Sequence, residues 1–293
     1  MGRPWNKQRV AQLKAIARIR ASPISACRPR RRGSVADEII VALTSYPARI
    51  DGVWLAVRSL LHQKYRADRL VLVLSRDEFP GLVLPRRLQT LTRHGLTIMW
   101  VEGNIRSYKK LLPVLKDNPE AIIVTADDDA LYPSWWLDSL IAAHLERPRH
   151  ILAHRANRIL LNANCRPEPY LEWSHATTQT PSVLVFPTGV GGVLYPPQSL
   201  PQQVLDAALA LRLCPTTDDI WFRVMAFIAG TPVGVVSDAF QEFVTIPRTQ
   251  HEALIQLNVE EGQNDADLRR ALDHFGLWGK FECSLPPEAR ARA

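Results

Sequence analysis

Three consecutive aspartates, Asp127, Asp128 and Asp129, directly follow the apolar segment 121–126. A short run of β-branched residues without charges is typical of a buried strand, and ligands of open α/β sheets bind at the carboxyl ends of the strands. Adjacent carboxylates repel each other unless a cation or hydrogen-bond donors neutralise them, and hard oxygen ligands suit Mg²⁺ or Mn²⁺. The pattern predicts a divalent-metal site. The alternative is an acidic loop in which one aspartate caps the next helix.

Two further clusters carry groups that suit a nucleotide. Thr44, Tyr46 and Arg49 lie in a Thr-Ser-Tyr-Pro-Ala-Arg segment that leaves the first predicted strand. A hydroxyl and an aromatic ring can hold a base and a ribose, and a guanidinium pairs with phosphate. Lys109 and Lys110 lie near the start of a predicted helix, where the helix amino terminus and the basic side chains favour an anion. The alternatives are an ordinary Tyr-Pro turn and a solvated basic helix face.

Gly191 and Gly192 belong to the glycine-rich segment 188–197. Glycines let a backbone approach a ligand closely, so this segment is a candidate binding loop. The Gly-Lys-Ser/Thr ending of a phosphate P-loop is absent. The alternative is a glycine-rich turn that precedes a strand.

A second acidic pair, Asp218 and Asp219, opens a helix predicted over 218–229. That helix is apolar almost all round and should therefore be buried. Asp218 suits a helix cap, and Asp219 is the better candidate for a catalytic base aimed into a cleft. His154 follows the short apolar segment 151–153 and is a candidate metal ligand, with a structural role as the alternative.

The elements that must position these groups alternate between strands and helices. The strands are predicted over 39–45, 69–75, 97–102 and 121–126, with helices starting at Asp51 and over 85–95, 107–116 and 133–146. This alternation predicts a mostly parallel sheet with right-handed crossovers. After residue 151 the rhythm is lost, and the segment 162–200 is rich in proline, glycine, threonine and aromatic residues, which indicates loops over one end of the sheet.

Composition narrows the class of protein. The chain has 293 residues, of which 46% are hydrophobic, and no run that approaches the roughly 18 apolar residues of a membrane span. No apolar core of a signal peptide is found, and the four cysteines form no CxxC pair. We therefore expect a cytoplasmic protein with reduced thiols.

The positive net charge is confined to the first residues of the chain. Residues 1–34 hold ten Lys/Arg and no acid, whereas the rest carries 26 Lys/Arg against 29 Asp/Glu. A body without a basic excess argues against nucleic-acid binding. Val10, Leu13, Ile16 and Ile19 recur every third residue, which predicts a basic amphipathic helix on an anionic membrane. The alternative is a disordered tail that has no part in the chemistry.

Taken in order, these blocks resemble the GT-A fold glycosyltransferases, and most closely the bacterial polysaccharide-type, family 2-like enzymes. The resemblance covers roughly residues 37–275 and rests on Thr-Ser-Tyr-Pro-x-Arg, Ser-Tyr-Lys-Lys, Asp-Asp-Asp, His-Arg, Gly-x-Gly-Gly-x-Leu-Tyr-Pro and Asp-Asp-Ile-Trp. It implies a Rossmann-like α/β domain over residues 37–285, with a nucleotide-sugar half (37–150) and a loop-rich acceptor half (151–285). Residues 1–36 form a basic tail and linker in this scheme.

The resemblance also implies roles for the acidic residues. Asp127 and Asp129 correspond to the Asp-x-Asp pair that binds a divalent metal with the sugar nucleotide, and Asp128 to a ribose or sugar contact. Asp219 corresponds to the base of inverting members, although Asp218 stands where many relatives carry glutamate. A glycan or lipid-linked molecule would be the acceptor. The rival hypotheses are a metal-dependent phosphohydrolase or nucleotidyltransferase, and a sugar-nucleotide-binding module without catalysis.

Overall fold

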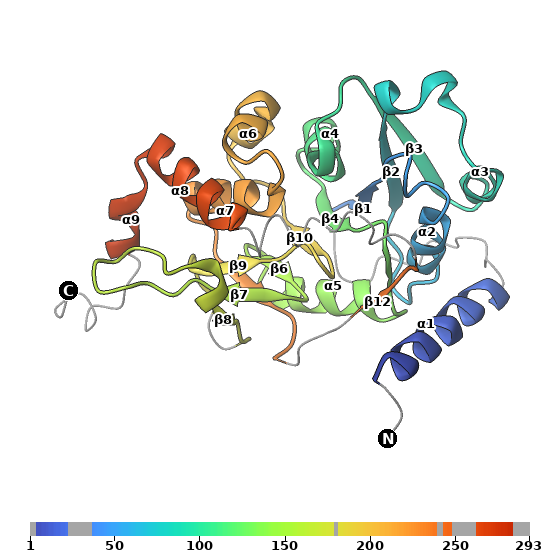
Figure 1. Ribbon diagram of the computed structural model, residues 1–293, viewed down its shortest axis with the longest axis horizontal. Coiled ribbons are helices and arrows are strands. Elements are labelled where there is room, and N and C mark those ends of the chain that lie inside the picture. The colour runs from blue at the N-terminus through green and yellow to red at the C-terminus, as the bar shows by residue number, and fades with distance from the viewer. Residues whose placement is uncertain (1–3, 23–36, 179–180, 239–242, 248–261, 284–293) are drawn as a thin grey trace.

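The protein is built on a seven-stranded sheet with helices on both faces (Figure 1). The computed structural model describes residues 4–22, 37–178, 181–238, 243–247 and 262–283. The strands of this sheet are β1 (Ile39–Thr44), β2 (Arg69–Ser75), β3 (Leu96–Val101), β4 (Ile122–Ala126), β6 (Ile151–Ala153), β10 (Val193–Tyr195) and β11 (Val233–Val235). Their order across the sheet is β11-β6-β10-β4-β1-β2-β3.

Most neighbouring strands of the sheet are parallel. The pairs β1–β2, β1–β4, β2–β3 and β6–β11 are parallel, whereas β10 runs antiparallel to both β4 and β6. The predicted α/β fold with a mostly parallel sheet is therefore confirmed. Because β10 is reversed, the segment that precedes it lies at the same edge as the segments that follow β1, β4 and β6.

Alternation along the strands divides the core into two layers. In β1, Ile40 and Ala42 face one layer, and Val41 and Leu43 face the other. Since both faces are buried, the central strands β1 and β4 are apolar apart from Thr44 and Thr125. Helices α4 (Leu112–Asp117), α7 (Asp218–Ala229) and α8 (Gln263–Phe275) cover the first layer. Helices α2 (Val53–Leu61), α3 (Arg86–Thr92) and α5 (Trp136–Glu146) cover the second.

The remaining elements are short. The two small sheets are β5 (Ala130–Leu131) with β12 (Val244–Thr245), and β7 (Ala156–Arg158) with β8 (Ser174–His175) and β9 (Val185–Pro187). The other helices of the domain are η1 (Arg76–Glu78), η2 (Pro80–Leu82), η3 (Arg106–Lys110), η4 (Tyr170–Glu172), η5 (Gln202–Leu205), α6 (Ala207–Leu213) and α9 (Trp278–Cys283).

The helix predicted over 107–116 is divided in two. The 3₁₀ helix η3 ends at Lys110, and α4 begins at Leu112 with Pro113 in its first turn. Proline has no amide hydrogen to donate and disfavours helical geometry in the residue before it, so it is tolerated only where a helix begins. The division leaves the basic pair at the carboxyl end of a short 3₁₀ helix.

Helix α1 (Pro4–Ala21) lies against the domain beside α2 and β12 (Figure 1). The prediction of a helix is confirmed, but the prediction that Val10, Leu13, Ile16 and Ile19 share one face is wrong. Ile16 is buried, whereas Val10 and Leu13 are exposed. Residues three apart drift around a helix of 3.6 residues per turn, so the four side chains divide between the two faces. No described helix is both long enough and apolar enough to cross a bilayer.

The structure describes the thiols of Cys165 and Cys214, and both are buried and free. Cys27 and the side chain of Cys283 lie outside the described part of the chain.

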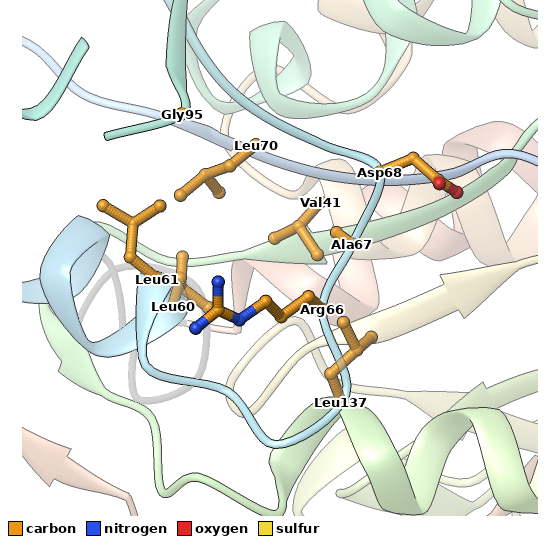
Figure 2. A pocket seen from close by; sticks show the side chains of 9 residues that line it. All are labelled: Val41, Leu60, Leu61, Arg66, Ala67, Asp68, Leu70, Gly95 and Leu137. Atoms are coloured by element: carbon orange, nitrogen blue, oxygen red, sulfur yellow. The ribbon is translucent and has the colours of Figure 1, made fainter. Parts of the chain in front are cut away.

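A cavity of about 220 Å³ lies at the amino-terminal edge of the parallel strands (Figure 2). Its lining residues precede or begin strands, or lie on helices α2 and α5: Val41, Leu60, Leu61, Arg66, Ala67, Asp68, Leu70, Gly95 and Leu137. None of the residues that the sequence analysis selected lines this cavity. The candidate chemistry is therefore gathered at the opposite, carboxyl-terminal edge.

Candidate active site

The aspartate loop, residues 127–129, connects β4 to β5 at the carboxyl edge of the sheet. Asp128 is buried and accepts hydrogen bonds from Ser45 Oγ at 2.6 Å and from Arg49 at 3.0 Å. Asp129 accepts from the same Arg49 nitrogen at 3.1 Å. Burial raises the pKa of Asp128, although Arg49 and Ser45 oppose that shift. Asp128 therefore ties the loop to the segment that follows β1.

Asp127 is held differently. Its backbone amide donates to the Tyr132 hydroxyl at 2.7 Å, and its carboxylate lies 3.6 Å from the Lys110 ammonium. Burial raises the pKa of Asp127, Lys110 opposes the rise, and the nearby Asp129 and Asp219 add to it. This carboxylate thus lies in a cluster of negative charge that one lysine only partly neutralises.

Lys110 joins the aspartate loop to the start of helix α7. Its ammonium lies 3.0 Å from Asp218 as well as 3.6 Å from Asp127. Burial alone would lower the pKa of Lys110, but Asp218, Asp127 and Asp219 raise it well above the ordinary value. Lys110 is therefore a charged bridge between two acidic segments that are about 90 residues apart in the chain.

Asp218 and Asp219 have separate environments. Asp218 accepts a hydrogen bond from Ser107 Oγ at 2.9 Å besides its contact with Lys110. Asp219 Oδ2 accepts from the backbone amide of Gly189 at 2.7 Å. Burial, together with the adjacent Asp218, raises the pKa of Asp219, while Lys110 and the Gly189 amide lower it. The Asp219 carboxylate is therefore a stronger base than an exposed aspartate.

The glycine-rich loop approaches protein side chains. Gly189 has no room for a side chain, because a Cβ atom there would lie 2.8 Å from Asp219 Oδ1. A Cβ atom on Gly192 would lie 2.5 Å from the Trp136 ring and 2.9 Å from the Thr125 carbonyl oxygen. The Gly191 carbonyl accepts the indole hydrogen of Trp136 at 2.5 Å. The loop is close-packed on Trp136 and β4, which accounts for its glycines without a ligand.

Lys109 points away from the aspartates. It forms an ion pair with Glu78 and lies 3.3 Å from the Asn104 side-chain oxygen. The two lysines predicted as one anion site therefore serve two acidic partners, and the structure does not bring Lys109 to the aspartate loop. Adjacent residues of a helix point in different directions, which is the physical reason for this separation.

The first loop is only partly directed at the site. The Thr44 hydroxyl donates a hydrogen bond to the Val73 carbonyl oxygen of the neighbouring strand β2 at 2.8 Å. The Tyr46 ring lies 5.5 Å from the guanidinium of Arg49. Arg49 itself binds two of the three aspartates of the loop, instead of standing apart as a phosphate ligand.

His154 requires a correction. It is buried on Trp136, with Nε2 3.0 Å from the Trp136 carbonyl oxygen and the two rings stacked at 6.3 Å. Burial lowers the pKa of His154 to about 4. Within the part of the chain that the structure describes, no three His, Cys, Asp or Glu side chains are grouped as metal ligands. His154 therefore does not join the aspartates as a third ligand.

The remaining donor set still suits a hard divalent cation. The residues at this edge comprise five carboxylates and two cations: Asp127, Asp128, Asp129, Asp218 and Asp219 with Arg49 and Lys110. The Asp127 and Asp129 side chains keep 23% and 19% exposure, so both can reach a ligand. Mg²⁺ and Mn²⁺ sites commonly use one or two carboxylates and complete their coordination with substrate phosphates. Asp127 and Asp129 fit that role.

Sequence reasoning missed four residues that shape the site. Ser45 and Tyr132 fix the aspartate loop, while Ser107 and Gly189 fix the two aspartates of helix α7. Ser45, Ser107 and Gly189 lie inside motifs that were recognised, but a motif does not tell which hydroxyl or amide faces a carboxylate. Tyr132 carried no signal in the sequence.

Comparisons with known proteins give structural likenesses only. No protein-family model and no curated protein sequence matches the chain. A mannosyltransferase from Pyrobaculum calidifontis, PcManGT, solved with GDP-Man and Mn²⁺, is 15% identical with a TM-score of 0.48, covering 98% of this chain and 82% of that one. S. aureus TarS (residues 1–349) is 14% identical with a TM-score of 0.45, covering 87% and 77%.

A third similar structure belongs to a different class of enzyme. CMP:2-keto-3-deoxy-manno-octonic acid synthetase, solved with CTP, is 12% identical with a TM-score of 0.41, covering 76% of this chain and 98% of that one. At these TM-scores we base no argument on any of the three likenesses.

Proposed function

We propose that this chain is a metal-dependent GT-A glycosyltransferase, which transfers a sugar from a nucleoside-diphosphate sugar to an acceptor hydroxyl with inversion. The observation that supports this most is the Lys110 bridge, which holds Asp127 of the aspartate loop and Asp218 of helix α7 within 3.6 Å of one ammonium. The bridge brings the aspartate loop, which is suited to a metal, to the start of helix α7, which carries the candidate base Asp219.

On the donor side, Asp127 and Asp129 would hold Mn²⁺ or Mg²⁺. The bound cation would neutralise the charge that develops on the departing diphosphate. Asp128, fixed by Ser45 and Arg49, keeps the loop in place and is also the candidate for the ribose or sugar contact. Thr44 and Tyr46 remain candidates for donor contacts in this proposal. Lys109, Gly191 and Gly192 do not, because their contacts are with Glu78, Phe243 and Trp136.

On the acceptor side, Asp219 would accept the proton of the attacking hydroxyl. The Gly189 amide fixes one oxygen of its carboxylate. Burial raises its pKa, so the carboxylate is a better proton acceptor than an exposed aspartate, provided that it is ionised at the working pH. Asp218 is engaged by Ser107 and Lys110, and its part is to hold the start of helix α7 in place.

The partners in this proposal are a sugar-nucleotide donor and a glycan or lipid-linked acceptor, with no nucleic acid. The pathway would be the synthesis of a bacterial surface polysaccharide or glycoconjugate. The enzyme would act in the cytoplasm, in contact with the anionic inner surface of the membrane through residues 1–34.

The test is a panel of nucleoside-diphosphate sugars, each measured by calorimetry and thermal shift with Mn²⁺ and with EDTA. We expect one donor to bind with Mn²⁺ and to raise the melting temperature, because a ligand that binds only the folded state stabilises it. Asp127→Asn and Asp129→Asn should abolish the Mn²⁺-dependent part of binding. Asp117→Asn, a change of an exposed aspartate at the end of α4, is the matched control.

Three outcomes would contradict the proposal in different ways. A donor affinity in EDTA equal to that in Mn²⁺ would show that donor binding does not depend on a metal. Release of free sugar or of a monophosphate in the absence of any acceptor would favour a phosphohydrolase or nucleotidyltransferase. Donor binding without turnover on any glycan or lipid acceptor would favour a binding module.

A further inference from the structure

Helix α1 is fastened to the domain along one side. Arg58 of helix α2 donates to three carbonyl oxygens at the end of α1, those of Ile19, Arg20 and Ser22, at 2.7, 3.2 and 2.5 Å. The carbonyls of a last helical turn have no partners within the helix, so Arg58 caps it from outside. Ile16 is buried between α1 and the domain.

A second attachment links α1 to the aspartate loop. The Gln12 side chain donates to the Thr245 carbonyl of β12 at 2.6 Å. Strand β12 pairs with β5, which directly follows the loop, and the amide of Ile246 donates to the Asp129 carbonyl at 2.7 Å. Only one strand therefore separates helix α1 from the candidate metal ligands, so the helix has a fixed place relative to the site.

The opposite side of α1 faces solvent and is both basic and apolar. At 100° per residue, one arc of the helix carries the exposed residues Val10, Leu13, Lys14, Ala17, Arg18 and Ala21. Leu13 is 58% exposed and Val10 is 44% exposed. No acidic residue occurs in α1 or anywhere in residues 1–34. We call this set of six residues the outer face.

We propose that the outer face of α1 is a docking surface for an anionic lipid bilayer, with the inner face of the helix remaining on the domain. Basic side chains near such a surface attract anionic headgroups, and exposed apolar side chains enter the interface between headgroups and acyl chains. The inference deepens the membrane contact of the proposed function by naming its surface. A bilayer bound there would be separated from the aspartate loop by helix α1 and strand β12.

Vesicle co-sedimentation tests the surface without any transfer assay. The full chain should bind phosphatidylglycerol vesicles at low salt, bind them less as salt rises, and not bind phosphatidylcholine vesicles. The double change Lys14→Gln/Arg18→Gln should weaken binding about 30-fold, since each basic residue near an anionic surface contributes about 1 kcal/mol and 1.4 kcal/mol is tenfold. Leu13→Gln should weaken it by a smaller factor.

The control is Arg93→Gln/Arg269→Gln, which removes the same charge from two exposed positions elsewhere on the domain. If vesicle affinity fell equally in the control and in the outer-face variant, binding would depend only on net charge. That result would overturn the assignment of the outer face as the docking surface. Failure of the wild-type chain to bind phosphatidylglycerol would overturn the inference while leaving the transferase proposal untouched.

Arg58→Gln tests whether the helix stays on the domain. If docking uses only the outer face, weakening the cap should leave vesicle affinity unchanged or lower it. The opposite model has α1 detach and place Ile16 and Ile19 in the lipid. Loosening the helix would then raise vesicle affinity, and that result would overturn the attached geometry.

Discussion

At the carboxyl edge of the sheet, Asp127 and Asp219 are held near one lysine, whereas at the amino edge Leu60, Leu61 and Leu70 surround a cavity. Both edges are formed by the same strands. The cavity carries one cationic side chain, Arg66, which extends beside Leu60 and Leu61 (Figure 2). The carboxyl edge carries five carboxylates, and two of them have pKa values that burial raises markedly.

The difference shows what each edge contributes. Buried charges of like sign lower the stability of the folded chain unless a partner neutralises them, so the carboxyl edge retains groups that packing alone would not favour. The amino edge is lined by apolar side chains that stabilise the domain, together with Arg66 and Asp68. Perturbed acids in one place are a functional-site signal, and the predictions below separate function at one edge from stability at the other.

The largest effect is expected at Asp219. Asp219→Asn is nearly isosteric and should lower the transfer rate by roughly 10²–10⁴, the usual contribution of general acid–base catalysis, with donor affinity unchanged. The wild-type rate should fall as the pH falls through the raised pKa of Asp219, because the protonated carboxyl cannot accept a proton. Transfer rate and melting temperature are measured on the same samples. A loss of stability with near-normal transfer would exclude Asp219 as the base.

The Lys110 bridge should have the largest effect on stability. Lys110→Met leaves the buried Asp218 and the half-buried Asp127 without their cation, and breaking a buried pair in this way costs about 3–5 kcal/mol. The loss should narrow as the pH falls, because Asp127 and Asp219 become neutral through their raised pKa values. Urea unfolding at neutral and acidic pH measures it, with exposed Lys116→Met as the control. Equal stability of the two variants would show that Lys110 does not bridge the acids.

Close packing of the glycine-rich loop gives a smaller effect on stability. Gly192 and Gly276 both have positive φ, 92° and 62°, but only Gly192 has neighbours within reach of a Cβ atom. Gly276→Ala therefore reports backbone strain without a steric contact, at a φ inside the left-handed region, whereas the φ of Gly192 lies beyond that region. Gly192→Ala should lower the free energy of unfolding by about 1–3 kcal/mol more, the usual cost of overpacking. If urea unfolding gave the same loss of unfolding free energy for both variants, the Trp136 ring would be able to move away from the added methyl group without destabilising the fold.

The sequence was sufficient for the framework of the first half. Uninterrupted apolar runs predicted β1, β2 and β4, and the run of aspartates was correctly placed at the end of β4. These features are local, because a strand buried on both faces must be apolar along its length. The buried helix that Asp218 opens was also predicted, since only a buried helix is apolar all round.

Contacts between segments that are distant in the chain could not be predicted from the sequence. The residue type of Lys110 suggested a phosphate ligand, yet its partners are two acids from other segments. The residue type of His154 suggested a metal ligand, yet its ring packs on Trp136 and its Nε2 lies 3.0 Å from the Trp136 carbonyl oxygen. The sequence analysis placed the apolar residues of helix α1 on a single face, because a spacing of three residues does not show which side of the helix packs on the domain. Side-chain direction and partner choice depend on tertiary packing, which a single sequence does not display.

The smallest effect is expected at the amino edge. Ala67→Val adds apolar volume to a cavity of about 220 Å³, and each buried methylene contributes about 0.8 kcal/mol, so the free energy of unfolding should rise by about 0.5–1 kcal/mol. Ala67→Thr has the same shape with a hydroxyl in place of one methyl group, and it should stabilise less. Donor affinity and transfer rate should match the wild type in both variants. A changed donor affinity in Ala67→Val, with the expected gain in stability, would mean that the cavity is coupled to the aspartate loop and that the two edges are not independent.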